Sequence, residues 1–262
     1  MEYKNLAKLI EIIEILRSEN GCAWDREQTH ESLKRNMLEE AYEAVDAINS
    51  QDMKHLKEEL GDVLLQVVLH SQIAKEENAF DIEDVAKTIS EKLIHRHPHV
   101  FGETKVSNTE EILANWEKLK QEEKPHRISV MDGISKSQSA LMTAQKASKK
   151  AVKVGFEWPN EDELWKCVNS EFIEFKEAKT QEHKEEELGD ILFAVVNLAR
   201  WNKIDAEQAL IKSNEKFIQR FRMMEKLATK PLNEHSFEEY DNLWKQAKKA
   251  VVKENYDRST SI

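Results

Sequence analysis

The sequence predicts an all-α protein, and three of its features support that fold class. Only six glycines and four prolines occur among the 262 residues, which leaves few positions for the tight turns that join β-strands. Leu, Glu, Lys and Ala, which favour helices, are abundant. Apolar residues in the longer segments recur at helical spacing. We therefore expect a protein built from helices.

An internal repeat predicts two domains of the same kind. The tetrapeptide Glu-Leu-Gly-Asp occurs at 59–62 and again at 187–190, an offset of 128 residues. Trp116 and Trp244 are separated by the same offset, and GCAWDREQTH upstream of the first copy matches VGFEWPNEDE upstream of the second. Several landmarks in the same order indicate a duplication. The expected architecture is two repeated antiparallel helical bundles.

The join between the two repeats is expected in the segment KPHRISVMDGIS, residues 124–135. Pro125 and Gly133 fall close together there, and both residue types interrupt helices. This places an N-terminal domain at 1–125 and a C-terminal domain at 126–262. The chain is long enough for each domain to bury a core of its own.

Within the first repeat, apolar spacing and turn residues predict four main helices. They are expected at 31–49, from Met53 to Glu77, from Asp81 to the residues before Pro98, and from Thr109 to Glu123. The second repeat should follow the same order. The expected helix caps are Ser50 or Asp52, Asp81 with Asp84, and Asp205 with Gln208. Because the connections are short, consecutive helices should lie antiparallel.

The charge of the chain bears on its partners. The formal net charge is −11, from 39 basic and 50 acidic residues, and an acidic surface disfavours binding to nucleic acid or to an anionic membrane. No uncharged apolar stretch reaches 18 residues, so a transmembrane span is not expected. Cys22 and Cys167 stand far apart, without a Cys-x-x-Cys partner. The simplest interpretation is a reduced, cytoplasmic compartment.

Spaced acidic side chains on two consecutive helices form the candidate site of the first repeat. Glu40 and Glu43 are three residues apart, so both project from one face of their helix. Glu59 and Asp62 have the same spacing on the next helix, which should lie antiparallel to the first. The four carboxylates can then face one another in one pocket.

Four carboxylates in one pocket repel one another strongly. Two of them about 5 Å apart repel by roughly 3 kcal/mol at an effective dielectric constant near 20, and the whole set by on the order of 10 kcal/mol. A domain is stable by only about 5–15 kcal/mol. Such a cluster must therefore bind cations, take up protons or splay outward. Oxygen ligands without His or Cys suit Mg²⁺, or alternatively Mn²⁺.

The alternative interpretation is a solvated acidic face, which is common for charged runs on helices. Apolar neighbours such as Leu60 and Val63 beside Glu59 and Asp62 argue against it. Recurrence argues against it too, because the second repeat keeps four equivalent acids. They are Glu171, Glu174, Glu187 and Asp190.

The second repeat departs from the first in two ways. Ser170 stands where the first repeat has Glu39, the acid that precedes Glu40. The stretch from Glu174 to Glu187 is also three residues shorter than its counterpart, which we expect to reflect a shorter turn between the helices.

Glu-Glu-x-x-Glu on one helix followed by Glu-x-x-Asp on the next resembles the MazG family of all-α nucleoside triphosphate pyrophosphohydrolases. The likeness extends to CAWDREQTHESL, RHPHVFGE, ALMTAQKASKKAVKVGFEW and SNEKFIQRF, and so covers nearly the whole chain in a tandem two-domain form. The resemblance implies Mg²⁺-dependent hydrolysis of a nucleoside triphosphate at the α-phosphate, which yields the monophosphate and pyrophosphate. It also implies a homodimer.

The resemblance assigns roles to particular residues by position. The metal ligands it implies are Glu40, Glu43, Glu59 and Asp62 in the first repeat, and Glu171, Glu174, Glu187 and Asp190 in the second. The nucleotide contacts it implies are Lys92, Arg96 and Trp116, and Lys216, Arg220 and Trp244. Elementary chemistry agrees, because cations four residues apart on a helix can hold one phosphate chain. A tryptophan can stack on any base, although core packing explains each tryptophan equally well.

Catalysis requires a group that orients or deprotonates the attacking water. Glu39 is the first candidate, and Glu58 and Glu186, which lead into the two Glu-Leu-Gly-Asp motifs, are the others. Ser170 then predicts a slower second site unless Glu186 substitutes. A different class of function remains open: a non-catalytic helical dimer module that senses nucleotides, which Ser170 makes plausible for the second repeat.

Overall fold

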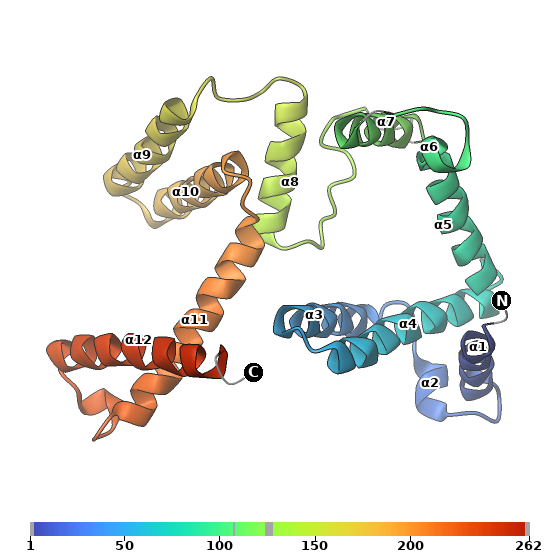
Figure 1. Cartoon of the computed structure of the whole chain (residues 1–262), viewed down its shortest axis with the longest axis horizontal. Helices are drawn as coiled ribbons and strands as arrows, with labels where there is room; N and C mark the ends of the chain where they lie inside the picture. The colour runs from blue at the N-terminus through green and yellow to red at the C-terminus, as the bar shows by residue number, and fades with distance from the viewer. Residues whose placement is uncertain (1–2, 107, 124–127, 260–262) are drawn as a thin grey trace. The chain divides into compact units, whose positions relative to one another are not determined.

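The computed structural model describes residues 3–106, 108–123 and 128–259, and every regular element in these ranges is a helix (Figure 1). The expected all-α class is confirmed. Contacts divide the chain into two compact units, Met1–Pro125 and His126–Ile262. Pro125, expected at the join, lies outside the described residues, whereas Gly133 adopts the positive φ of 80° that glycine tolerates.

The first unit is built around a pair of antiparallel helices. Its helices are α1 Lys4–Arg17, α2 Ala23–Glu27, α3 Lys34–Ser50, α4 Met53–Glu76, α5 Ile82–Arg96, α6 Pro98–Phe101 and α7 Thr109–Glu122. Helix α3 packs along α4, α1 packs on the other end of α4, and α5 packs on α7 (Figure 1). The four predicted helices are thus present.

The second unit repeats this order. Its elements are α8 Ala140–Lys153, α9 Glu161–Glu177, α10 Gln181–Trp201, α11 Ala206–Leu227, the short 3₁₀ helix Leu232–Glu234 and α12 Phe237–Ser259. Helix α9 packs along α10, α8 packs on α10, and α11 packs on α12 (Figure 1). Helices α8 to α12 therefore correspond to α1, α3, α4, α5 and α7.

The first predicted helix begins three residues later than expected, at Lys34 instead of residue 31. Two reciprocal hydrogen bonds hold a turn in front of it: Thr29 N donates to Ser32 Oγ, and Ser32 N donates to Thr29 Oγ1. Short hydroxyl side chains offer the backbone such alternatives to a helix. Leu33, only 1% exposed, follows this turn and is buried in the core.

The helix caps follow the predicted residues. Asp52 caps α4 by accepting from Lys54 N and His55 N, whereas the alternative, Ser50, donates its hydroxyl to Ala47 O. Asp81 and Asp84 form a reciprocal capping box at α5. Asp205 caps α11 by accepting a hydrogen bond from Gln208 N.

The expectation of a shorter turn in the second repeat is wrong. The connection itself is longer there, Ala178 to Thr180 against Gln51 and Asp52. The helix before it accounts for the difference, because α3 runs on for seven residues after Glu43, whereas α9 runs on for only three after Glu174. The two repeats thus differ by about one helical turn at the end of this helix.

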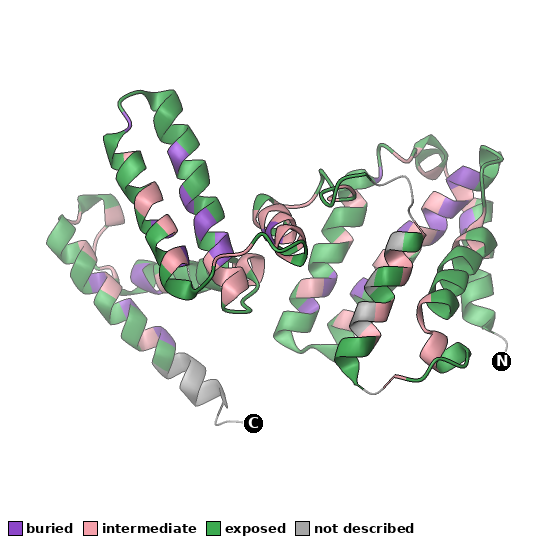
Figure 2. Ribbon diagram, turned by 90° about the horizontal axis from the view of Figure 1, so that it is seen from above, coloured by how far each residue is buried: buried purple, intermediate pink, exposed green. Residues whose placement is uncertain are grey.

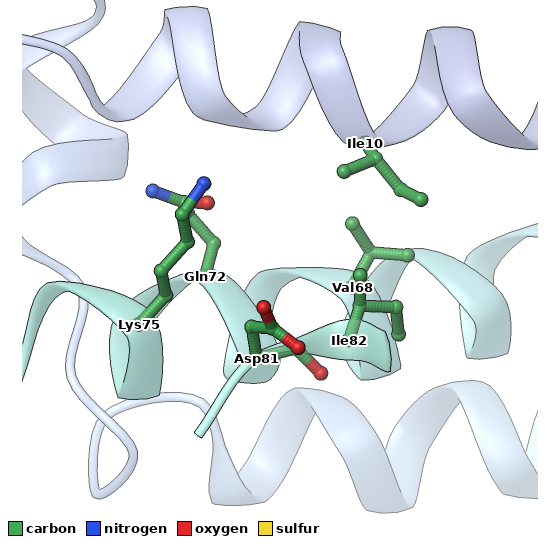
Figure 3. A pocket seen from close by; sticks show the side chains of 7 residues that line it. Ile10, Val68, Gln72, Lys75, Asp81 and Ile82 are labelled. Atoms are coloured by element: carbon green, nitrogen blue, oxygen red, sulfur yellow. The ribbon is translucent and has the colours of Figure 1, made fainter. Parts of the chain in front are cut away.

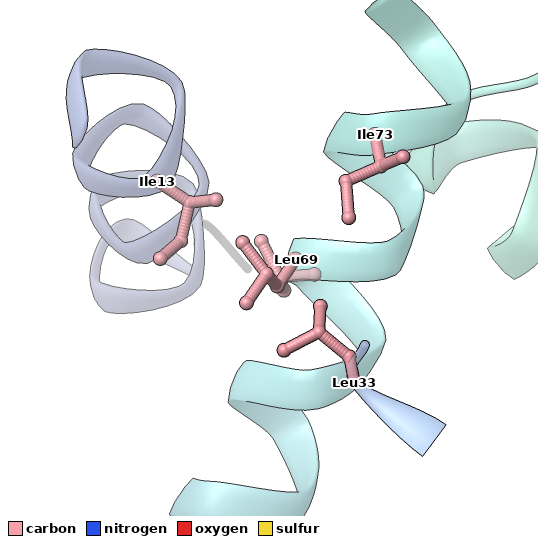
Figure 4. Packing of buried hydrophobic residues seen from close by; sticks show 5 residues of the cluster. Ile13, Leu33, Leu69 and Ile73 are labelled. Atoms are coloured by element: carbon pink, nitrogen blue, oxygen red, sulfur yellow. The ribbon is translucent and has the colours of Figure 1, made fainter. Parts of the chain in front are cut away.

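Buried side chains concentrate on narrow stripes where the helices meet, while most of each helix surface is exposed (Figure 2). In the first unit, Ile13 on α1 faces Leu69 on α4, and Leu33 lies close by (Figure 4). The second unit has two separate clusters. One joins α9 to α10, and the other joins α11 to α12.

A small pocket lies where α5 begins, beside α1 and α4 (Figure 3). Its charged lining has structural roles, because Lys75 pairs with Glu14 and Asp81 caps α5. Lys75 is sixteen residues beyond Glu59, which places it about 24 Å away along α4. The pocket is therefore separate from the carboxylates. Among the described helices, none is long and apolar enough to span a membrane.

Candidate metal and nucleotide site

Three acids of the first unit come together on the α3–α4 pair. Glu40 and Glu43 on α3 and Glu59 on α4 each offer one carboxylate oxygen, and these oxygens lie within 4.8 Å of one another. Glu59 is buried, Glu40 is half-buried and Glu43 is exposed. The cluster therefore opens to solvent on the α3 side.

Three acids of the second unit come together in the same way. Glu171 on α9 and Glu187 and Asp190 on α10 each offer an oxygen, again within 4.8 Å of one another. Glu187 is the buried member, as Glu59 is in the first unit. The described residues contain no further group of three or more potential metal-binding side chains.

The fourth expected acid of each unit lies beside its cluster. Asp62 is close enough to Glu40 to raise the pKa of that carboxyl, after the larger effect of burial. Glu174 raises the pKa of Glu171, again second to burial. All four expected acids of each unit are thus near one another, although three of them are closest.

The pKa values show the repulsion that the spacing predicts. Partial loss of hydration and then neighbouring carboxylates raise the pKa of Glu40, Glu43 and Glu171 above the ordinary value of 4.5, and this holds even for Glu43, whose side chain is exposed overall. Glu59 supplies one of these neighbouring charges, and its own Oε2 is buried without a hydrogen-bond partner among the described residues. Such an arrangement favours a proton or a cation between the acids.

Two histidines that sequence reasoning did not select contact the buried glutamates. His55 Nε2 lies 2.8 Å from Glu59 Oε1, and His183 Nε2 lies 2.8 Å from Glu187 Oε1. A signal was present in the sequence, since each histidine stands four residues before its glutamate at the common offset of 128. It was missed because neither lies within the acidic motif.

The three candidate catalytic acids are exposed. Glu39 is close enough to add to the repulsion that raises the pKa of Glu40 and Glu43, so it lies at the edge of the first cluster. Glu58 and Glu186 are exposed on α4 and α10, next to the buried glutamates.

Ser170 does not replace the carboxylate of Glu39 in the second unit. Its hydroxyl donates to Cys167 O, 2.8 Å away, and so faces its own helix backbone. The Cys167 thiol lies 3.8 Å from Glu171 Oε1, and burial followed by the charge of Glu171 raises the pKa of that thiol.

The expected nucleotide contacts of the first unit lie on α5 and α7. Lys92 is exposed, and Arg96 forms an ion pair with Glu123, with Nε donating to Oε1 at 3.0 Å. The Trp116 ring is 39% exposed and lies 6.3 Å from the His97 ring, centroid to centroid.

The corresponding residues of the second unit form a tighter group on α11 and α12. The Arg220 guanidinium lies 5.9 Å from the centroid of the Trp244 ring, and the Phe217 ring packs 5.5 Å from it. Arg220 Nε is buried without a hydrogen-bond partner among the described residues. Lys216 on the same helix is exposed.

Each unit therefore presents its predicted site residues in two groups. The acids lie on α3 with α4 and on α9 with α10, whereas the cations and tryptophans lie on α5 with α7 and on α11 with α12. In each unit the second pair extends away from the first (Figure 1). The prediction that both groups act on one nucleotide remains a prediction.

Comparison with known proteins matches both units to one family. The model of the MazG nucleotide pyrophosphohydrolase domain matches residues 28–101 and 161–224, which include both acid clusters. A nucleoside triphosphate pyrophosphohydrolase/pyrophosphatase MazG of Thermotoga maritima is 46% identical over 92% of this chain and 94% of its own length. A nucleoside triphosphate pyrophosphohydrolase of Escherichia coli K12 is 42% identical over 94% of this chain and 97% of its own length.

The family match falls on the same paired helices in both units, and the two relatives align with the chain over nearly their whole length. A helical protein with two such domains, each carrying an acid cluster on a helix pair, is what the repeat in the sequence predicts. The chain belongs to the MazG nucleotide pyrophosphohydrolase family and is a hydrolase.

Proposed function

We propose that the chain hydrolyses ribo- or deoxyribonucleoside triphosphates at the α-phosphate, with Mg²⁺ as cofactor and Mn²⁺ as a possible substitute. Water attacks the α-phosphorus, the bond to the oxygen bridging to the β-phosphorus breaks, and the nucleoside monophosphate and pyrophosphate are released. One observation carries the proposal: in both units, three carboxylate oxygens from paired helices lie within 4.8 Å of one another.

The residues present fit a hard divalent cation. The donors are all carboxylate oxygens, which Mg²⁺ and Mn²⁺ prefer. The buried Oε2 of Glu59, which has no hydrogen-bond partner among the described residues, can be satisfied by a cation. The ligands would be Glu40, Glu43, Glu59 and Asp62, and in the second unit Glu171, Glu174, Glu187 and Asp190. Bound there, the cation would polarise phosphate oxygens and offset the charge of the leaving pyrophosphate.

The chain's own acids supply the proton transfer. We assign Glu39 the role of orienting the attacking water and accepting its proton, because it lies at the edge of the cluster and is exposed. Glu58 is the alternative base in the first unit. Glu186 is the candidate in the second unit, where the Ser170 hydroxyl is bonded to the backbone.

The cations and tryptophans would bind the rest of the substrate. Lys92 and Arg96, and their counterparts Lys216 and Arg220, would neutralise the triphosphate. Trp116 and Trp244 would stack on the base, which fits acceptance of several nucleobases. The half-buried guanidinium of Arg220 and ring of Trp244 already show a cation–π arrangement in the second unit.

A homodimer is part of the proposal because the acid-bearing helices leave apolar side chains exposed. Leu38 and Tyr42 on α3 are 51% and 60% exposed, and Leu60 on α4 is 53% exposed. In the second unit, Phe172 on α9 and Leu188 on α10 are likewise exposed. Contiguous exposed apolar side chains favour association. A second copy covering these faces would exclude water beside the acids and supply a second set of helices to the site.

The proposed setting is the cytoplasm, without nucleic acid or membrane as partner. Cys22 and Cys167 are both free thiols, which fits a reducing compartment. The net charge of −11 disfavours binding to nucleic acids and to anionic lipid surfaces.

The products of hydrolysis test the function. The full chain should convert ATP, and other nucleoside triphosphates in a panel, to monophosphate and pyrophosphate with Mg²⁺ or Mn²⁺, and should be inactive in EDTA. Chromatography separates these products from the diphosphate and inorganic phosphate that γ-phosphate cleavage would give. A Glu59→Gln, Glu187→Gln double variant should lose activity, whereas Glu185→Gln, an exposed acid on α10, should retain it. Release of diphosphate, or activity in EDTA, would contradict the proposal.

A nucleotide-sensing role without turnover is the second candidate, for the second unit alone. It is favoured by Ser170, whose hydroxyl is turned to its own helix. With the first cluster disabled by Glu59→Gln, equilibrium binding of a nucleotide and Mg²⁺ without measurable pyrophosphate release would support sensing. Turnover by that variant would establish catalysis in the second unit.

A further inference from the structure

Both units place a histidine against their buried cluster glutamate. His55 Nε2 and Glu59 Oε1 are 2.8 Å apart, and His183 Nε2 and Glu187 Oε1 are also 2.8 Å apart. An ionised carboxylate can only accept a hydrogen bond, so Nε2 of each imidazole is the donor. The spacing of four residues on one helix brings the two side chains together.

The start of the helix holds each histidine in place. His55 N donates to Asp52 Oδ1 at 3.0 Å, and His183 N donates to Thr180 Oγ1 at 3.1 Å. Each histidine is thus the third residue of its helix, in the turn that the capping side chain closes. The cap fixes the histidine backbone, and the imidazole then reaches the glutamate one turn later.

This arrangement persists although its surroundings differ between the units. The cap is Asp in one and Thr in the other, and the preceding helix continues for seven residues after Glu43 in the first unit but for three after Glu174 in the second. The imidazoles are 45% and 51% exposed, whereas the glutamate side chains are only 8% and 9% exposed. Half-exposed histidines contribute little to a core, so packing does not account for their place in both repeats.

The hydrogen bond from the histidine gives the two oxygens of the Glu59 carboxylate different surroundings. His55 contacts Oε1 of Glu59, and Oε2 stays buried without a hydrogen-bond partner among the described residues. Glu59 offers one of its oxygens to the cluster with Glu40 and Glu43. A donor on one oxygen restricts rotation of the carboxylate and so fixes the position of both oxygens relative to the cluster. Groups that bond to a metal-binding carboxylate in this way tune its affinity for the ion.

We propose that His55 and His183 are positioning residues that hold Glu59 and Glu187 in the orientation that binds the divalent cation. This inference rests on the proposed function, because it requires the clusters to bind a cation. Removal of the imidazole frees the carboxylate to rotate and leaves Oε1 without its donor. Metal affinity should then fall by about tenfold, the lower end of the range for residues that orient ligands, because the imidazole is half exposed.

The test measures Mn²⁺ binding to the full chain without nucleotide, by the electron paramagnetic resonance signal of free Mn²⁺. Three double variants are compared with the unaltered protein. They are His55→Ala with His183→Ala, His55→Gln with His183→Gln, and Lys54→Ala with Lys184→Ala. Glutamine keeps an N–H donor that can reach four residues along the helix. The lysine variant removes positive charge from the same turns and leaves both histidines, so it separates charge from the hydrogen bond. Thermal unfolding in EDTA shows whether each variant folds.

The expected result is a Kd for Mn²⁺ about tenfold higher for the alanine variant, a Kd restored to within about threefold by glutamine, and little change for the lysine variant. Normal Mn²⁺ binding by the alanine variant would overturn the inference and leave the proposed function intact. Absence of Mn²⁺ binding by the unaltered protein would overturn both. An equal loss in the alanine and glutamine variants, both folded, would also contradict a role for the donor.

Discussion

The two units form similar acid clusters, but the two helices of each pair supply different numbers of acids. In the first, two acids from α3 meet one from α4; in the second, one acid from α9 meets two from α10. The two first helices have the same length of 17 residues, but the equivalent acids Glu43 and Glu174 stand seven and three residues before the helix end. Glu171 stands six residues before the C-terminal end of α9, and Glu43 stands seven residues before that of α3. These two acids therefore lie at similar distances from the ends of their helices.

What stays constant lies on the second helix of each pair. Its cap, its histidine and its glutamate occur at equivalent positions in both units. In each cluster this glutamate is the buried acid. The acids of the first helix can therefore shift along that helix while one carboxylate of the second helix remains buried. This teaches that the buried glutamate anchors the cluster and that the other acids assemble around it.

The largest expected effect comes from the anchor itself. Glu59→Gln should lower turnover by the first unit by about 10³-fold, because it removes a charge from the cation site without changing the shape of the side chain. Glu187→Gln should do the same to the second unit. Pyrophosphate release by each single variant reports the activity of the opposite unit, and the ratio of the two rates measures how unequal the units are. Wild-type rates in both single variants would show that these glutamates are not ligands.

The exchange of Glu39 and Ser170 should have the next largest effect. A general base contributes roughly 10²–10⁴-fold, so Glu39→Ser in a Glu187→Gln background should lower the remaining first-unit turnover by about 100-fold. Ser170→Glu in a Glu59→Gln background should raise second-unit turnover. The measured quantity is kcat for pyrophosphate release at saturating Mg²⁺. An unchanged kcat in both backgrounds would move the role of the base to Glu58 and Glu186.

The helix order and the acid pairs could be predicted because both follow from local spacing. Apolar periodicity and caps such as Asp52 and Asp81 defined the helices, and acids three residues apart necessarily share a helix face. Antiparallel packing then brought Glu40 and Glu43 to Glu59. The start of α3 was misplaced because the Thr29–Ser32 hydrogen bonds depend on a turn that periodicity does not reveal.

Other features of the site depend on distances that sequence spacing does not contain. The three closest acids of each four differ between the units, and so does the distance of the acids from the end of the first helix, which the alignment misread as a change in the turn. The separation of the acids from Arg96 and Trp116 depends on how α5 leaves α4. The histidine contacts depend on a side-chain rotamer, although the spacing of His55 and Glu59 allowed them.

A smaller effect should distinguish the two caps. Thr180→Ala removes one hydrogen bond, which His183 N donates to Thr180 Oγ1 at 3.1 Å. This change should lower the free energy of unfolding by about 1 kcal/mol. Asp52→Ala should cost more, because Asp52 accepts from both Lys54 N and His55 N and places a negative charge at the positive end of the helix dipole. Urea unfolding of each variant in EDTA measures the difference. Equal losses would show that the second hydrogen bond and the charge add nothing.

The smallest expected effect is the dependence of stability on pH in the absence of metal. Burial and neighbouring carboxylates raise the pKa of Glu40 above 4.5 in the folded protein. A carboxyl with a raised pKa holds its proton more tightly when folded, so its contribution favours folding at low pH and is lost as pH rises through the raised value. In EDTA, Glu40→Gln should therefore be slightly more stable than wild type at pH 7.

This advantage of Glu40→Gln should disappear as the pH falls toward 4.5, because the wild-type carboxyl then carries its own proton. The same reasoning applies to Glu171→Gln in the second unit, where Glu174 and Asp190 supply the repulsion after burial. Mg²⁺ should reverse the order at pH 7, since a bound cation stabilises the wild-type cluster and the variant loses a ligand. Unfolding midpoints at pH 7 and near pH 4.5, with and without Mg²⁺, measure both changes. A variant less stable than wild type in EDTA at pH 7 would show that these acids are compensated within the fold and do not require a cation.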